Sequence, residues 1–160
     1  MDRQAFETKG FTGWVPLLAF LDQPRLPNAP GVYAVEYSGG KPQAWPDKSC
    51  GGWHKGRNPA VTVDQLSANW VDDASIVYIG MSTRPLAARL GEFVKFGHGK
   101  AIGHWGGRLI WQLPEPSRLH VGWLELDGIA PRSREAELIA EFRGIYGKPP
   151  FANDPHKWGT

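Results

Sequence analysis

The sequence has little of what marks several common classes of protein. It holds one cysteine, Cys50, which excludes an internal disulfide framework and a cysteine-based zinc site. No apolar run approaches the roughly 20 residues that a membrane-spanning helix needs. The first residues, MDRQAFETKG, do not resemble a secretory signal. We therefore expect a cytoplasmic protein that does not use a membrane.

The residues that are present favour a folded domain. The chain has 160 residues, of which 41% are hydrophobic and 12% aromatic, with eight tryptophans. This composition argues against disorder and provides enough apolar side chains for a core. Because the length suits one domain and is short for two, we predict a single domain over residues 1–160.

Positive charge is concentrated in the middle of the chain. The net charge is only +2, yet residues 79–118 hold six basic side chains against two acidic ones. The basic residues of this stretch are Arg84, Arg89, Lys95, Lys100, Arg108 and Arg118. Such a stretch is typical of a face that binds a polyanion. A solvated helix surface explains the charge equally well, so both interpretations stay open.

Periodicity predicts an α/β chain of the α+β type, with a small, mainly antiparallel sheet of three strands flanked by helices. Strands are expected at 31–37, 75–81 and 119–126. Helices are expected at 12–21 with Thr12 as cap, after Thr62, after Ser82 or Thr83 with Pro85 in the first turn, and at 133–146 with Gly147 as C-terminal cap. Segment 108–113 fits a strand or a helix. Residues 38–74 form an insertion in which Trp45 and Trp53 are the expected anchors.

Two of the expected strands carry a tyrosine beside a glycine. The first begins Gly31-Val32-Tyr33, and the second contains Tyr78-Ile79-Gly80. A phenol with a pKa near 10 is a poor base at neutral pH unless a nearby cation lowers that pKa. With a cation beside it, a tyrosine could take a proton from water. Tyrosine also packs well in strands, so a purely structural role is the alternative.

The last expected helix places a carboxylate on its apolar side. The buried stripe predicted for this helix is Leu138, Ile139, Phe142, Ile145 and Tyr146. Glu135 precedes the first three by three, four and seven positions and therefore shares their face. A carboxylate at the edge of an apolar face needs a partner, and Mg²⁺ is a suitable one. The alternative is that Glu135 only favours the helix N-terminus electrostatically.

Arg89 borders the apolar stripe of the helix that follows the second strand. Its guanidinium could hold a phosphate through two hydrogen bonds and stabilise negative charge in a transition state. The alternative is a surface ion pair with Glu92, three residues later, which contributes at most about 0.5 kcal/mol.

As an ordered set, these motifs resemble the GIY-YIG nuclease family. GVY at 31–33 stands for GIY, YIG at 78–80 is intact, and Arg89 follows on the next helix. Glu135-Ala136-Glu137-Leu138-Ile139 matches the glutamate step of the family, and Pro149-Pro150-Phe151-Ala152-Asn153 matches its tail. The resemblance covers about residues 30–153.

The resemblance implies a metal-dependent endonuclease that hydrolyses phosphodiester bonds, with DNA as the expected nucleic acid. It implies one Mg²⁺ or Mn²⁺ held by Glu135, a tyrosine as base with Tyr33 favoured, and Tyr78 orienting water or phosphate. Arg89 would stabilise charge, and Asn153 would hold the network together. The residues expected to bind substrate are Gly80, Arg84, Lys100 and Arg108. A homodimer or a partner protein is expected to supply specificity.

Three features depart from the family pattern. Between Tyr33 and Tyr78 lie 44 residues, where the family has a short connection. Met81 follows YIG, and Phe93 stands where some members have a histidine, which His98 or His104 could replace. The insertion brings basic residues and tryptophans that could touch nucleic acid, namely Lys41, Lys48, Lys55 and Arg57 with Trp45 and Trp53.

Two other functions stay open. One is a nucleic-acid-binding module of the same fold without turnover. The other is a protein-interaction domain whose tryptophan-rich insertion holds a partner.

Overall fold

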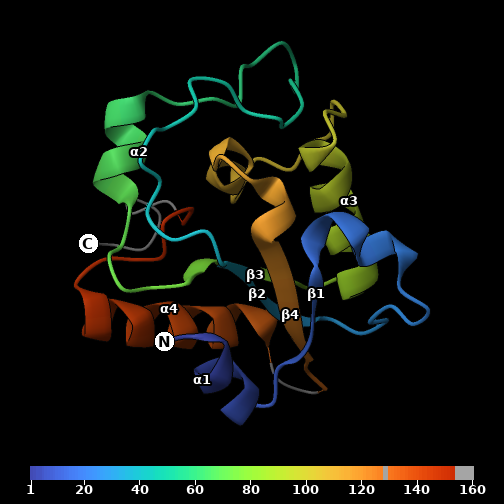
Figure 1. The fold of residues 1–160 in the computed structure, drawn as a ribbon. Helices are drawn as coiled ribbons and strands as arrows, with labels where there is room; N and C mark the ends of the chain where they lie inside the picture. The colour runs from blue at the N-terminus through green and yellow to red at the C-terminus, as the bar shows by residue number, and fades with distance from the viewer. Residues whose placement is uncertain (128–129, 154–160) are drawn as a thin grey trace.

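A four-stranded antiparallel sheet lies at the centre of the computed structural model, which describes residues 1–127 and 130–153 (Figure 1). The strands are β1 (Thr12–Pro16), β2 (Gly31–Tyr37), β3 (Ile76–Ser82) and β4 (Leu119–Glu125). Their order across the sheet is β1-β4-β2-β3, and every neighbouring pair is antiparallel. The predicted α+β class and antiparallel sheet are confirmed, whereas the predicted count of three strands is wrong.

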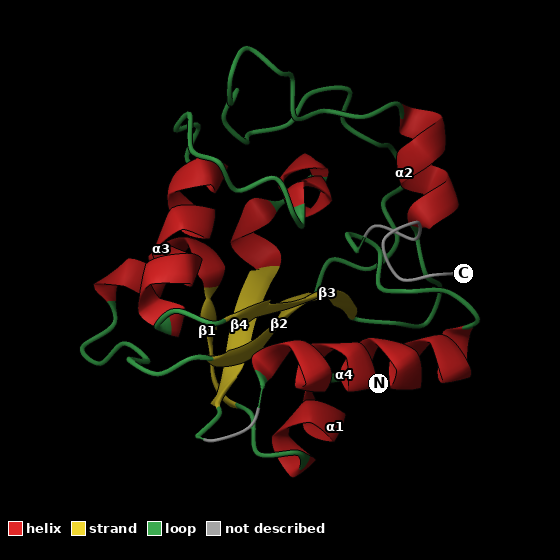
Figure 2. Ribbon diagram, turned by 180° about the vertical axis from the view of Figure 1, so that it is seen from behind, coloured by secondary structure: helices red, strands yellow, loops and turns green. Residues whose placement is uncertain are grey.

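Helices cover both faces of the sheet (Figures 1 and 2). The α-helices are α1 (Arg3–Thr8), α2 (Val63–Asn69), α3 (Leu86–Gly97) and α4 (Pro131–Tyr146). The 3-10 helices are η1 (Leu17–Asp22), η2 (Arg108–Gln112) and η3 (Pro116–Arg118). Helices α1 and α4 lie on one face, and α3, η1 and η2 lie on the other. Within the described residues, no helix combines the length and apolarity needed to cross a bilayer.

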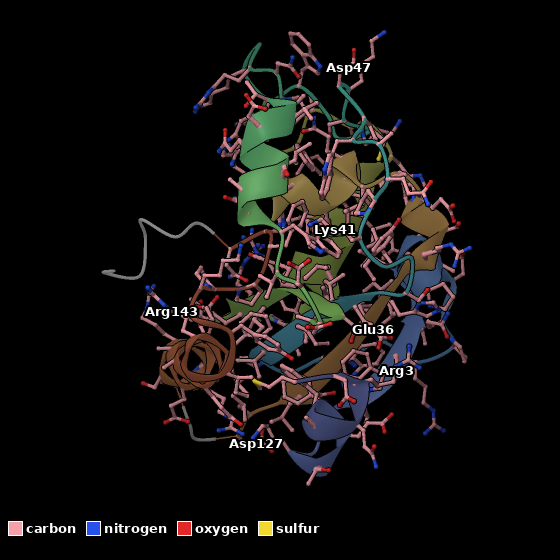
Figure 3. All side chains as sticks on the ribbon, turned by 60° about the vertical axis from the view of Figure 1, so that its left-hand side comes forward. Arg3, Glu36, Lys41, Asp47, Asp127 and Arg143 are labelled. Carbon is pink, nitrogen blue, oxygen red and sulfur yellow. The ribbon has the colours of Figure 1, made fainter. Side chains whose placement is uncertain are left out.

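The sheet separates two hydrophobic cores. Alternation along β2 sends Tyr33 and Val35 into the core on the α3 side, and Val32 and Ala34 into the core on the α4 side. Helix α1 is tied to the sheet by an ion pair in which the Arg3 Nε donates to a Glu36 carboxylate oxygen at 3.0 Å (Figure 3). Both faces of β2 are therefore covered, which explains why nearly all of its residues are buried.

The first strand occupies a segment for which the sequence predicts a helix. Gly13 and Trp14 both have positive φ, 91° and 56°, and this breaks any helix capped by Thr12. The same two residues form a bulge against β4, where a glycine, Gly122, leaves room for the Trp14 ring. The segment predicted as one helix at 12–21 is therefore a strand followed by the 3-10 helix η1.

The helix boundaries need smaller corrections. Pro85 itself is the N-cap of α3, and the Ser82 hydroxyl hydrogen-bonds to the backbone of Arg84, so neither Ser82 nor Thr83 caps the helix. Helix α4 begins at Pro131, and Gly147 ends it with a φ of 78°, as predicted. Ile145, predicted in the buried stripe of α4, is 57% exposed because it lies on the solvent side of the last turn.

The insertion, residues 38–74, packs over the α3 side of the sheet. Trp45 is a true anchor, since its ring stacks on Phe151 at 5.8 Å and meets Trp70 edge-on at 5.8 Å. Trp53 is not an anchor, because it is 56% exposed. Thr62 caps α2 by accepting a hydrogen bond from the Gln65 amide, as the sequence predicts.

A buried glutamine fastens the insertion to the rest of the domain. Gln112, on the last turn of η2, accepts a hydrogen bond from the Val61 amide at 2.9 Å. Its side-chain amide donates to the carbonyls of Pro46 and Val61, both at 2.9 Å. Since one side chain pairs with three backbone groups, it holds the insertion at two points, Pro46 and Val61.

Replacing Gln112 by leucine tests this role. We expect Gln112→Leu to lower the free energy of unfolding by about 1–3 kcal/mol, because the backbone groups of Pro46 and Val61 lose their hydrogen-bond partner. Urea titration measures this loss, and hydrogen exchange at the Val61 amide should become faster. Gln43→Leu, the same change at an exposed insertion site, is the control and should leave both readouts close to wild type. Equal behaviour of the two variants would contradict the role given to Gln112.

Candidate active site

The two tyrosines lie side by side on the α3 face of the sheet. Tyr33 is paired with Gly80 across β2 and β3, and Tyr78 is paired with Val35. Since both residues occupy the same face, their ring centroids are 5.9 Å apart with an interplanar angle of 61°. Both side chains are buried, Tyr33 completely.

Gly80 provides the space that the Tyr33 ring fills. A Cβ at Gly80 would lie 2.5 Å from Cζ and 2.6 Å from the hydroxyl oxygen of Tyr33. In the structure Gly80 is buried and allows this close packing, and its predicted contact with substrate stays a prediction. Met81 points to the opposite face and packs against the α4-side core, so this departure from the family pattern does not reach the tyrosines.

Glu135 brings a carboxylate to the pair from the first half of α4. The residue is 8% exposed, on the same helix face as Leu138 and Phe142, as the sequence predicts. Its charge raises the pKa of both tyrosines, which places it within electrostatic reach of the two hydroxyls. In residues 1–127 and 130–153, this site included, no group of three or more histidine, cysteine or acidic residues could hold a metal ion.

Arg89 supplies the positive charge. It lies on α3 with its side chain 28% exposed, and its charge lowers the pKa of both tyrosines. Glu92 lies 3.6 Å from this guanidinium and 2.8 Å from that of Arg84. The ion pair that the sequence offers as an alternative therefore exists, but Arg89 acts on the tyrosines as well. Four elements, β2, β3, α3 and α4, thus bring Tyr33, Tyr78, Arg89 and Glu135 into one electrostatic cluster.

Burial raises the pKa of both phenols, and each tyrosine affects the other. Burial raises the pKa of Tyr33 to about 12, against the lowering by Arg89 and by the nearby Tyr78 hydroxyl. Burial raises the pKa of Tyr78 well above 10, and the neighbouring Tyr33 and Glu135 raise it further. Among the described residues, the Tyr33 hydroxyl has no partner in good hydrogen-bonding geometry. It is a buried polar atom for which a ligand at the site would provide a partner.

His104 joins the cluster from the glycine-rich connection between α3 and η2. Its ring stacks on Phe93 with centroids 4.2 Å apart and planes 4° apart, and the side chain is fully buried. His104 therefore lies against the position where the resemblance expects a histidine, whereas His98 is exposed just after α3. Burial, with the charges of Arg89 and Arg84, lowers the pKa of His104 to about 3.

Two glycines let this connection cross the tyrosines. A Cβ at Gly107 would lie 2.8 Å from the Tyr78 ring, and one at Gly106 would lie 3.3 Å from the Tyr78 hydroxyl. Gly107 also has a φ of 77°, which favours glycine. The adjacent glycines at 106–107 were a visible signal in the sequence, but their partner, Tyr78, could be found only in three dimensions.

Asn153 fixes the strand that carries Tyr78. Its side-chain oxygen accepts a hydrogen bond from the Ile79 amide at 3.0 Å, and its side-chain nitrogen donates to the Ile79 carbonyl at 2.8 Å. The Ala152 amide donates to the Val77 carbonyl at 2.8 Å. Because β3 is an edge strand, these bonds satisfy backbone groups that no further strand covers. Asn153 therefore acts on the tyrosine site through the backbone of Ile79, the residue between Tyr78 and Gly80.

The other residues predicted to bind substrate lie outside the buried cluster. Arg84 is exposed and pairs with Glu92, and Lys100 is exposed on the connection. Arg108 is half-buried at the start of η2, with its guanidinium 4.7 Å from the centre of the Trp105 ring. Sequence reasoning gave no role to Trp105, although it lies between the predicted His104 and Arg108.

The low pKa of His104 makes stability depend on pH. The folded protein keeps His104 neutral down to about pH 3, whereas the unfolded chain binds a proton near pH 6.5. The stability that depends on a neutral His104 is therefore fully present above pH 6.5 and is lost as the pH falls below it. We expect the free energy of unfolding to drop by about 2 kcal/mol between pH 7 and pH 5 from this group alone.

Urea titrations at the two pH values measure this drop. His104→Phe should reduce it by that amount, and His98→Phe, at an exposed site, should leave it as in wild type. If all three proteins lose the same stability, His104 is not the buried neutral group described.

No family model, curated protein or solved structure gives a significant match to this chain.

Proposed function

We propose that the chain is a GIY-YIG-type endonuclease that hydrolyses phosphodiester bonds in DNA with the help of one Mg²⁺ or Mn²⁺. The observation that carries the proposal is the electrostatic cluster of Tyr33, Tyr78, Arg89 and Glu135, in which the charges of Arg89 and Glu135 shift both phenol pKa values. The order of the motifs along the chain supports the same proposal.

The residues present fit a single hard cation. Mg²⁺ is usually held by one or two carboxylates together with substrate phosphates and waters, not by a cage of protein ligands. Glu135 is one buried carboxylate, and its charge raises the pKa of two phenols. A cation held by Glu135 would stabilise the negative charge that develops on the departing 3′-oxygen.

The chain's own residues would do the rest. Tyr33, in its phenolate form, takes a proton from water, the water oxygen bonds to phosphorus, and the bond from phosphorus to the 3′-oxygen breaks. Tyr78 orients the water or the phosphate, and Arg89 stabilises the extra negative charge on the phosphate. The departing 3′-oxygen takes up a proton from solvent, so the products have 5′-phosphate and 3′-hydroxyl ends.

His104 suits a supporting role at neutral pH. Its pKa of about 3 keeps the imidazole neutral, so it has one N–H donor and one acceptor nitrogen. Among the described residues neither ring nitrogen has a hydrogen-bond partner. A phosphate oxygen at the site would accept a hydrogen bond from this imidazole.

A binding module without turnover is the second candidate. Glu92 lies between Arg84 and Arg89 and holds both guanidinium groups, which a structural role alone explains. This candidate requires DNA binding that weakens with salt and survives the loss of Glu135 without any cleavage.

Plasmid cleavage distinguishes the two. We expect Glu135→Gln to slow Mg²⁺-dependent nicking of supercoiled plasmid by about 100-fold or more, because the carboxylate charge is lost. Glu137→Gln is a matched control on the same helix, since Glu137 is exposed and pairs with Arg134. It should cut at the wild-type rate. Equal cutting by both variants would remove Glu135 from the mechanism, and no cutting by wild type would favour the binding module.

The dependence of cleavage on pH tests the base. Because the pKa of Tyr33 lies well above neutrality, the fraction of phenolate, and with it the rate, should rise with pH by up to about tenfold per unit from pH 7. Tyr33→Phe should lower the rate by about 10²- to 10⁴-fold and remove this rise. Tyr37→Phe, at a buried position on the same strand, should keep the wild-type profile. A rise with pH that persists in Tyr33→Phe would assign the base to another group.

A further inference from the structure

The tip of the insertion is docked on the glycine-rich connection. The Gly52 amide donates to the Phe96 carbonyl at 2.9 Å, and a Cβ at Gly52 would lie 1.8 Å from the Lys100 carbonyl oxygen. The His54 ring lies against Gly103, and the Arg57 guanidinium is 4.9 Å from the centre of the Trp105 ring. Two segments about 50 residues apart in the sequence thus form one surface, which we call the ledge and define as residues 53–57 and 100–108.

The tip has a defined conformation. The Arg57 amide donates to the His54 carbonyl at 3.0 Å, and the two residues between them, Lys55 and Gly56, have φ of 52° and 71°. Two positive φ values in succession within such a bond are typical of a type I′ turn. The turn therefore presents the side chains of Trp53 and Lys55 from a folded support.

The ledge and the residues that flank it carry positive charge only. Residues 48–57 and 95–108 hold six basic side chains and no acidic one, whereas the remainder of the chain holds twelve basic and sixteen acidic. The six are Lys48, Lys55, Arg57, Lys95, Lys100 and Arg108. A surface of one sign on a chain of net charge +2 is typical of a site for a polyanion.

Aromatic rings interleave these charges. Trp53 is 56% exposed at the tip, and the half-buried Trp105 has the guanidinium groups of Arg57 and Arg108 at 4.9 and 4.7 Å. An exposed indole between basic side chains can stack on an unpaired base while the charges follow the phosphates. In a duplex the base faces are already stacked on one another, so the indole would have no such surface to cover. The combination therefore favours a single strand.

The ledge adjoins the candidate active site. The connection that supports the tip also carries His104 onto Phe93 and passes over Tyr78 at Gly106 and Gly107. In Figures 1 and 2 the insertion arches over the α3 side of the sheet, the side on which the tyrosines lie. A strand held on the ledge would therefore continue toward the cluster.

We propose that the ledge binds a single-stranded stretch of the nucleic acid on which the site acts. This rests on the proposed function, and it specifies the substrate: DNA with an unpaired segment beside the bond that is cut. Lys41, which the sequence groups with the basic residues of the insertion, is not part of this surface. It pairs with Asp72 at 3.5 Å, and it is labelled in Figure 3.

Fluorescence anisotropy in EDTA measures binding without cleavage. The probes are a labelled oligothymidylate and a labelled blunt duplex of equal length, each titrated over a range of salt. Lys55→Asn suits the left-handed turn position, and Arg57→Gln keeps a side-chain stem on Trp105. Both residues are exposed, so the double variant should fold. Lys41→Ala is the control within the same insertion.

For the oligothymidylate, Lys55→Asn with Arg57→Gln should lower the slope of log affinity against log salt by about 1.4, which is 0.7 for each charge. Trp53→Ala should weaken binding about 5- to 150-fold, the effect of losing one stacked base. Lys41→Ala should change neither quantity, and the duplex should bind more weakly than the oligothymidylate to wild type.

The outcomes separate this proposal from the proposed function. If wild type cuts plasmid while the ledge variants bind the oligothymidylate as wild type does, the ledge proposal is wrong and the nuclease proposal stands. The ledge proposal is also wrong if wild type binds the duplex more tightly than the oligothymidylate, or if the ledge variants lose equal affinity for both probes. If wild type does not cut and the ledge variants bind the oligothymidylate more weakly than wild type, the ledge proposal is supported and the protein is a binding module.

Discussion

The close pairing of Tyr33 with Gly80 across β2 and β3 is the constraint on which the candidate site depends. Because Gly80 has no side chain, the Tyr33 ring lies flat over the neighbouring strand and its hydroxyl stays inside the fold beside Tyr78. Any larger residue at position 80 would displace the ring. The edge strand that carries Gly80 is in turn fixed at Ile79 by both polar atoms of the Asn153 side chain.

Burial makes these four ionisable groups depend on one another. In water the phenols would be indifferent to their neighbours, but inside the fold Arg89 lowers and Glu135 raises both phenol pKa values. The acidity of Tyr33 therefore responds to any change of charge at Glu135 or Arg89. A cation or a phosphate entering the cluster would therefore alter the proton affinity of Tyr33.

The sequence predicted the elements whose side chains follow a clear period, and it failed where backbone geometry decided. Alternation placed β2 and β3 within a residue or two, and helical spacing put Glu135 on the buried face of α4. Strand β1 was mistaken for a helix because its apolar run fits both periods, and only the positive φ of Gly13 and Trp14 excludes the helix. The position of His104 depends on close approach at Gly106 and Gly107, which no local pattern encodes.

The insertion and His104 meet on the glycine-rich connection. His54 lies against Gly103 and Arg57 lies over Trp105, on either side of His104. The insertion tip thus supports the segment that holds the imidazole against Phe93. Ordering each glycine of this connection costs conformational entropy. Without the support of the insertion tip, that cost would favour a connection that is not held against the sheet. The insertion is therefore part of the architecture of the site and not an addition to its edge.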